Sequence, residues 1–218
     1  MRIPVAVFLL FLSGAVFAQS PASPASRAHI QFAFENQQLQ PAAYSLEIYE
    51  DGTGRYLVSS GGNSGSQSSE RAIHIHDPLL SQLFDVARTH HFFAMNCEEP
   101  HSHVAFTGKK TLLYTGPDGT GSCTFNYSHD KTLNQAAADL MSVAYTLEVG
   151  ARLASEHLHD RLAVDGELES LQDAAQDHRA LELGNIAPEL GSIVNDDAVM
   201  NRARARARAL LLEPASLH

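Results

Sequence analysis

The sequence is poor in three features that commonly point to a function: cysteine, positive charge and long hydrophobic runs. It contains two cysteines, and its 15 Lys and Arg residues face 25 Asp and Glu residues, which gives a formal net charge of −10. An excess of negative charge repels the phosphate backbones of nucleic acids and anionic lipid surfaces. The composition therefore argues against nucleic acid or a membrane surface as a partner.

The longest apolar run lies at the N-terminus and is too short to span a membrane. Arg2 precedes an apolar stretch of about 13 residues that ends at Phe17, whereas a spanning helix needs roughly 20. Val16 and Ala18 occupy the −3 and −1 positions of a cleavage after residue 18. We therefore predict a signal peptide over residues 1–18, a secreted or periplasmic protein, and no membrane insertion after cleavage. Residues 19–28, rich in Pro, Ala and Ser, are expected to form a flexible leader.

The two cysteines favour a structural bond over a reactive thiol. In an oxidising compartment, two lone thiols such as Cys97 and Cys123 usually form a disulfide. The alternative is a catalytic thiolate at Cys97, activated by His101 or His129. Because a disulfide removes the nucleophile, the two interpretations exclude each other, and the predicted oxidising compartment favours the disulfide.

The first half of the chain has the pattern of antiparallel strands. Asp51-Gly52 lies between two alternating segments and predicts a hairpin, because glycine readily adopts the positive φ of such a turn. Asp77-Pro78 predicts the N-cap and first residue of a helix that ends near His90. Alternating apolar residues predict strands over 29–34, 44–49, 55–59, 72–76, 104–106, 111–115 and 123–127, with residues 61–69 as a loop.

The second half of the chain has helical periodicity. Apolar residues at 3–4 spacing predict one long helix over residues 131–162, which Asp165-Gly166 should end. Shorter helices are expected near 167–181, 187–195 and 198–212, with Asp197 as the N-cap of the last one.

Arginine alternates with alanine in the last of these helices. We expect the arginines of residues 202–208 to pair with the acidic segment 167–177, while Ala203, Ala207 and Leu210 pack inward. The predicted fold class is thus α+β: antiparallel hairpins with one packed helix, then a long helix and a helical C-terminal extension. Residues 29–163 should form the α+β domain and residues 164–218 the extension.

Two segments resemble known families. The hairpin sequence Tyr44-Ser-Leu-Glu-Ile-Tyr-Glu-Asp-Gly-Thr-Gly-Arg-Tyr56, with the core residues that follow it, resembles a group of exported bacterial proteins of unknown function. This resemblance covers residues 29–150 and implies a hairpin followed by a strand, a helix and a second hairpin, with no activity to transfer. Residues 181–212 are loosely similar to a single HEAT-type helical repeat.

Histidine is the unusual residue of this composition, with 12 copies, several of them in pairs. On a strand, residues i and i+2 project from the same face, so His74 and His76 should point together, and His101 and His103 likewise. Two such pairs on neighbouring strands would suit Zn²⁺ or Cu²⁺. The alternative is that these side chains are polar groups on the solvent face of the sheet, in which case no cofactor is expected.

No catalytic motif is present, neither a Gly-x-Ser-x-Gly elbow nor a His-Glu-x-x-His helix. The leading hypothesis is therefore a non-enzymatic binding or interaction module of a bacterial cell envelope, whose partner is an unknown protein or small ligand. It would act through its sheet face or its helical extension. An exposed apolar patch on residues 181–212 would support it, and a fully polar surface there would count against it. The alternatives are a histidine-rich metal-binding protein and a hydrolase without a recognisable motif.

Overall fold

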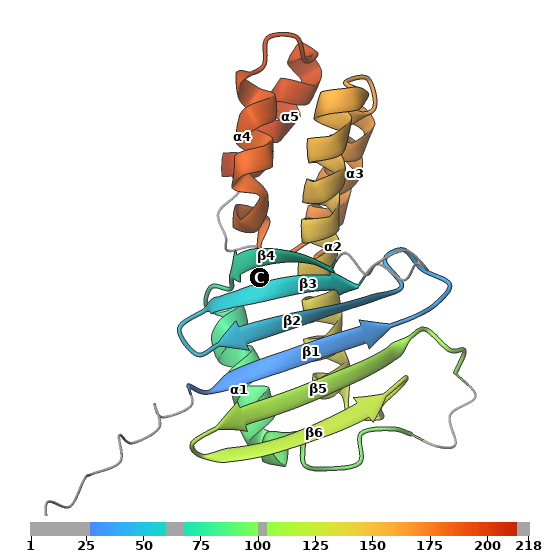
Figure 1. The fold of residues 1–218 in the computed structure, drawn as a ribbon, viewed down its shortest axis with the longest axis vertical. Coiled ribbons are helices and arrows are strands. Elements are labelled where there is room, and N and C mark those ends of the chain that lie inside the picture. Colours follow the sequence, from blue (N-terminus) through green and yellow to red (C-terminus); the bar gives the residue numbers. More distant parts are fainter. Residues whose placement is uncertain (1–26, 60–67, 100–103, 213–218) are drawn as a thin grey trace, which may run out of the picture.

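The computed structural model describes residues 27–59, 68–99 and 104–212, and it has the predicted α+β architecture. One antiparallel sheet has the strand order β4-β3-β2-β1-β5-β6 (Figure 1). The strands are β1 His29–Glu35, β2 Ala43–Tyr49, β3 Thr53–Ser59, β4 Ser68–His74, β5 Lys109–Gly116 and β6 Gly119–Phe125. The helices are α1 Leu79–Thr89, α2 Lys131–His159, α3 Val164–Gln176, α4 Ala187–Asn195 and α5 Asn201–Leu212, with 3-10 turns η1 His91–Phe93 and η2 Leu183–Ile186.

The hairpin of β2 and β3 forms as the sequence predicts. Gly52 has a φ of +80°, and its N–H donates to the carbonyl of Tyr49 across the turn. A side chain at this position would press on the carbonyl of Ile75, only 2.4 Å from an ideal Cβ. Both the backbone conformation and the lack of space therefore require glycine here.

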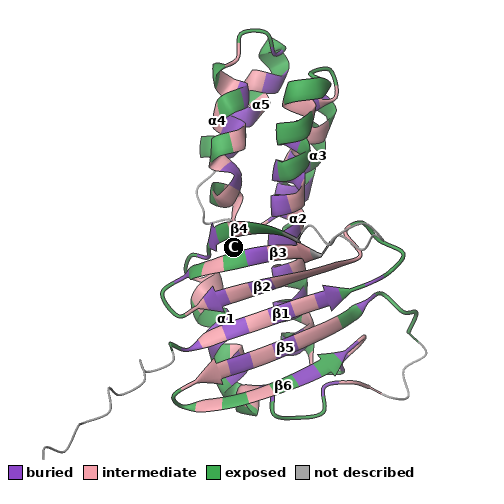
Figure 2. Cartoon of the chain, in the orientation of Figure 1, coloured by how far each residue is buried: buried purple, intermediate pink, exposed green. Residues whose placement is uncertain are grey.

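One face of the sheet is covered and the other carries no helix among the described residues. Helices α1 and α2 lie behind the sheet in Figure 1, and α2 runs across the strands. Alternate strand residues such as Ile30, Phe32 and Phe34 are buried against these helices, which contribute Leu83, Phe84, Leu133 and Leu140. The alternating burial along the strands in Figure 2 follows from the two-residue period of a strand.

A second buried cluster lies beyond the β4 edge of the sheet. The last turns of α2 continue past this edge and pack with α3, η2, α4 and α5 (Figure 1). The border between the two clusters falls inside α2, where Leu147 belongs to the first and Val149 to the second. One helix therefore supplies side chains to both cores. The predicted division of the chain at residue 163 stays a prediction.

The helical extension is attached to strand β4 by polar contacts. The Asn185 side chain accepts the N–H of His74 at 2.7 Å and donates to its carbonyl at 2.9 Å, as a neighbouring strand would. Arg71 forms an ion pair with Glu189 at 2.9 Å. An edge strand leaves backbone groups without partners. The extension thus satisfies part of the edge that β4 would otherwise expose.

The predicted elements in the sheet half need four corrections. Residues 104–106 form no strand, whereas β4 begins at Ser68, inside the segment predicted as a loop. β6 begins at Gly119, so only two residues separate it from β5. Helix α1 begins at Leu79 with Pro78 at its N-cap position, although the Asp77 carboxylate still accepts the N–H of Ser81.

The helical half also departs from prediction, because Asp165-Gly166 does not end the long helix. Helix α2 ends at His159, and Asp165-Gly166 lies in the first turn of α3, which ends at Gln176 rather than at residue 181. The last helix begins at Asn201 rather than at residue 198. Asp197 is therefore not its N-cap; it forms an ion pair with Arg204 instead.

The arginines of α5 behave largely as predicted. Arg206 pairs with Glu169 of α3 at 2.6 Å, and both Arg202 and Arg206 contact Asp165, which lies just outside the predicted acidic segment. Ala203, Ala207 and Leu210 are buried, as expected from their spacing.

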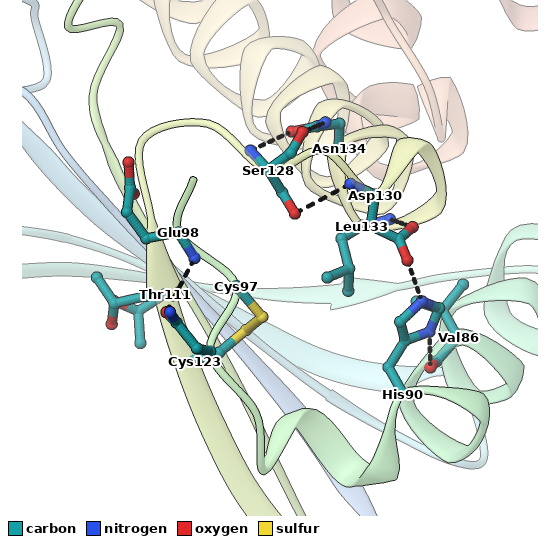
Figure 3. Close-up of a disulfide and its surroundings, with 12 residues drawn as sticks. Val86, His90, Cys97, Glu98, Thr111, Cys123, Ser128, Asp130, Leu133 and Asn134 are labelled. Carbon is teal, nitrogen blue, oxygen red and sulfur yellow. Dashed lines mark hydrogen bonds and ion pairs between the residues drawn. A yellow bond between two sulfur atoms is a disulfide. The ribbon is translucent and has the colours of Figure 1, made fainter. Parts of the chain in front are cut away.

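The predicted disulfide between Cys97 and Cys123 is present (Figure 3). It joins the segment after η1 to β6, and disulfides are typical of proteins that fold in an oxidising environment outside the cytoplasm.

Over the described residues, none of the helices combines the length and the apolar character needed to cross a bilayer. The predicted signal peptide, most of the predicted leader and the residues after Leu212 lie outside the described ranges. Ala28, at the end of the predicted leader, is buried, and its carbonyl accepts the N–H of Glu50.

Candidate ligand-binding groove

The histidines predicted to bind a metal are only partly within the described residues. The rings of His74 and His76 meet edge to face, with centroids 4.5 Å apart. His101 and His103 fall in the gap at 100–103. Within the described ranges, no group of three or more His, Cys, Asp or Glu side chains is arranged to hold a metal ion. The four-histidine site thus stays a prediction.

The thiol-dependent alternative is wrong for this structure. Both cysteines are consumed by the disulfide, and no free cysteine is present among the described residues. His129, one of the predicted activating histidines, instead lies 3.4 Å from a carboxylate oxygen of Glu99. A nucleophilic thiolate at Cys97 is therefore excluded.

A groove runs between α1 and α2 on the side of the sheet that the helices cover. It consists of two adjoining cavities of about 350 Å³ and 330 Å³. The two cavities lie side by side, because they share four lining residues: Leu79, Gln82, Gln135 and Asp139. We call this space the α1–α2 groove.

The helical period explains how the two walls arise. On α1, the lining residues Gln82, Val86 and Thr89 follow one another at 3–4 spacing, and on α2 Gln135 and Asp139 do the same. Residues at this spacing share one helix face. Each helix therefore presents a mixed polar and apolar face to the groove while its fully apolar face packs elsewhere.

The third wall comes from the connection between α3 and η2, which contributes His178, Leu181 and Glu182. His178 and Glu182 adopt left-handed backbone conformations, with φ of 56° and 58°. Such conformations are uncommon for residues other than glycine, and they need surrounding contacts to hold them. The helical extension is thus part of the groove.

The contact that holds this wall is a pair between His76 and Glu182. One Glu182 oxygen accepts the backbone N–H of His76 at 2.9 Å, and the other lies 2.7 Å from the ring Nδ1 of the same histidine. The Glu182 side chain is only 5% exposed. His76, predicted as a metal ligand, therefore fixes the α3–η2 connection against the start of α1.

Negative charge predominates in the groove. The described lining residues include the carboxylates of Asp77, Asp85, Asp139 and Glu182 together with two histidines, and they include neither lysine nor arginine. Burial raises the pKa of Asp139, although a hydrogen bond from Gln135 and the nearby His178 act in the opposite direction. The hydrogen bond and the nearby histidine therefore do not fully offset the cost of burying the negative charge of Asp139.

Little in the local sequence pattern indicated these residues. Asp139 lies beside the apolar positions that predicted α2, and the only local signal was its i, i+4 spacing from Gln135, whose amide donates to it at 2.8 Å. Glu182 reaches His76 across 106 positions of sequence. No local pattern predicts a contact of that range.

Exposed apolar side chains occur in the segment where the interaction hypothesis expected them. Met200, Leu211 and Leu212 are 39%, 38% and 76% exposed. Leu158 and Leu162, around the turn between α2 and α3, are 74% and 78% exposed. Leu158 and Leu162 lie outside residues 181–212, and single exposed apolar residues are common on ordinary surfaces, so the interaction hypothesis stays a prediction.

No protein-family model and no curated protein sequence matches this chain. The resemblances of residues 29–150 and 181–212 therefore stay predictions.

Proposed function

We propose that the chain is a secreted or periplasmic binding module that takes a small ligand in the α1–α2 groove. The observation that carries this proposal is the pair of adjoining cavities between α1 and α2, which share Gln82 and Asp139 in their lining. Each cavity falls in the size range of ligand sites, about 300–1,000 Å³. The disulfide and the predicted signal peptide support the location.

The composition of the groove supports binding of a ligand with both polar and apolar parts. Leu79, Leu83 and Leu181 supply apolar surface, while Gln82 and Gln135 supply amide donors and acceptors. Ligand sites commonly combine an apolar lining with a few placed polar groups. The groove is lined by α1, by α2 and by the α3–η2 connection, so a ligand there would contact the sheet half and the helical extension together.

The test is a nuclear magnetic resonance screen of the disulfide-bonded, isotope-labelled chain against a fragment library with cationic, neutral and anionic members. We expect shift changes at the side-chain amides of Gln82 and Gln135. Gln82→Trp should fill the shared part of the groove and abolish the shift change at Gln135, whose side-chain amide remains as the reporter. Gln176→Trp on α3 lies outside the groove and is the matched control.

Two outcomes would contradict the proposal. Ligands whose shift changes map to another surface, such as the open face of the sheet, would move the binding function away from the groove. Binding that survives Gln82→Trp unchanged would show that the groove does not hold the ligand.

A further inference from the structure

We infer that the α1–α2 groove selects linear aliphatic amines, that is, di- or polyamines whose ammonium groups are separated by alkyl segments. This inference rests on the proposed function and names its ligand class. Four features of the groove lead to it: the sign of its charge, its acceptors, its length and the absence of Trp, Tyr and Phe from its described lining.

The charged side chains of the described groove lining are mainly acidic. Asp85 and Asp139 lie on facing helices, and Asp77 and Glu182 lie at the end formed by the extension. Lysine and arginine are missing from this lining, and the nearby Arg88 is turned to Glu50 and Asp118. Charge complementarity therefore favours a cation.

The cation should be organic rather than a metal ion. The carboxylates and histidines of the described groove do not converge into a group of three or more that would coordinate a metal. An ammonium group carries only hydrogen-bond donors, and it can use acceptors that are spread along a surface. The amide oxygens of Gln82 and Gln135 and the hydroxyls of Thr89 and Thr132 are such acceptors.

The shape of the groove favours an extended ligand. From Leu79 to Thr89 the lining of α1 extends over about 15 Å at the helical rise of 1.5 Å per residue. Leu83, Val86 and Ala136 lie among the polar groups along this length. Alkyl segments of a linear amine would cover these apolar side chains while the ammonium groups reach the carboxylates.

The absence of Trp, Tyr and Phe from the described lining distinguishes between kinds of amine. Quaternary ammonium ligands are held by the faces of Trp, Tyr or Phe. The described groove has none of these and instead offers acceptors and the incompletely compensated Asp139. Primary and secondary amines, which donate hydrogen bonds, fit this lining better.

The inference is tested by calorimetry with six-carbon probes that share a chain and differ in charge: hexamethylenediamine, hexanediol and adipate, with spermidine as a longer amine. We expect the two amines to bind and the diol and dicarboxylate not to bind. Asp139→Asn should weaken amine binding by about tenfold or more, because it removes a partly buried charge partner. Asp173→Asn, an exposed position on α3, is the matched control and should leave binding unchanged.

A second readout separates loss of the site from loss of folding. Without ligand, Asp139→Asn should melt at a higher temperature than the parent chain at neutral pH, because the amide avoids burying a charge. A variant that binds amines poorly and is also less stable than the parent would overturn the assignment of Asp139 as a ligand-binding group.

The remaining outcomes distinguish the inference from the proposed function. If hexanediol or adipate binds in the groove as tightly as the diamine, the amine selectivity is wrong and the proposed function stands. If trilysine binds there but hexamethylenediamine and spermidine do not, the ligand is a basic peptide, and the small-amine inference is overturned. If no amine binds and no library fragment shifts the amides of Gln82 and Gln135, the inference and the proposed function both fail.

Discussion

Asp165 is a buried carboxylate that holds two helices of the extension together. Its side chain is 5% exposed, and one of its oxygens accepts from Arg206 of α5 at 2.7 Å while the other contacts Arg202. These hydrogen bonds, led by that from Arg202, lower the pKa of Asp165. The Asp-Gly pair that predicted a helix end thus serves as the link between α3 and α5.

Replacing Asp165 by Asn should destabilise the extension at neutral pH. Losing two charge-assisted hydrogen bonds corresponds to a fall in melting temperature of about 4–8 °C for a chain of this size. Because the folded pKa of Asp165 is lowered, its stabilisation is fully present above the ordinary aspartate pKa and disappears as the pH falls through the lowered value.

The measurement is a thermal unfolding series from neutral to acidic pH on the parent and Asp165→Asn. The difference between the two proteins should shrink at the acidic end. Asp173→Asn, at an exposed position of the same helix, is the control. A difference that stays constant with pH would contradict an ionised Asp165 as the stabilising group.

Gly150 is the position where α2 meets the extension most closely. An ideal Cβ at this residue would lie 2.4 Å from Cγ2 of the buried Ile186. A branched, buried side chain has little freedom to move away, so an added methyl group should strain the packing. Glycine here is a packing requirement rather than a break in the helix.

We expect Gly150→Ala to lower stability by about 1–2 kcal/mol, because overpacking outweighs the gain in helix propensity of about 1 kcal/mol. Gly166→Ala is the matched control, since a Cβ there meets nothing within 4 Å. It should keep the propensity gain and raise stability. Urea unfolding of both variants measures the difference, and a stabilised Gly150→Ala would show that Ile186 can move aside.

At the scale of elements, Asn185 connects the sheet to the helices. Its amide pairs with both backbone groups of His74, and it also donates to the carbonyl of Glu182 at 3.2 Å. A single side chain therefore joins the end of β4 to η2 and to the wall of the groove.

Asn185→Ala should loosen the extension more than the sheet. We expect a loss of about 1–2 kcal/mol and faster hydrogen exchange in α4 and α5 than in the parent, while exchange in β1 changes little. Asn195→Ala, at the exposed end of α4, is the control. An equal acceleration in β1 would indicate that the two cores open as one unit.

The segment η1 departs furthest from the backbone conformations that its residues usually adopt. His91, Phe92 and Phe93 all have positive φ, of 52°, 57° and 65°. The turn is held by packing, since Phe92 stacks on Tyr114 with ring centroids 5.0 Å apart and covers Gly119. The disulfide at Cys97 then fastens the same segment to β6.

At the scale of the whole molecule, the arginines of α5 are the cations that matter for binding to a polyanion. Arg202 and Arg206 are paired with acidic groups of α3, and Arg204 with Asp197, so these cations are compensated internally. The chain as a whole carries a formal net charge of −10.

The chain should therefore pass through a heparin column at physiological salt without retention, because polyanion binding needs uncompensated positive charge. A basic protein of similar size is the positive control. Salt-dependent retention would contradict the internal pairing, and loss of that retention in Arg202→Ala or Arg204→Ala would identify α5 as its source.

The sequence by itself determined the fold class, the β2–β3 hairpin, the position of α2 and the disulfide. The fold class, the hairpin and α2 follow from rules that act over a few residues, namely strand alternation, the positive φ of Gly52 and helical spacing. The disulfide follows because two cysteines can pair with each other in one way only. The start of β4 was missed because its pairing partner is another strand, β3. The turn at residues 160–163 was also missed, although the Ala163 N–H donates locally to the carbonyl of Asp160.

Only the tertiary structure decided the candidate site. The groove needs α1, α2 and the α3–η2 connection at once, and its closing contact joins His76 to Glu182 over 106 positions. The histidine pattern drew attention to His76 as a metal ligand, yet the structure gives this side chain a carboxylate partner from the extension. Contacts of this range depend on how whole elements pack, and the spacing of residues within one element carries no information about them.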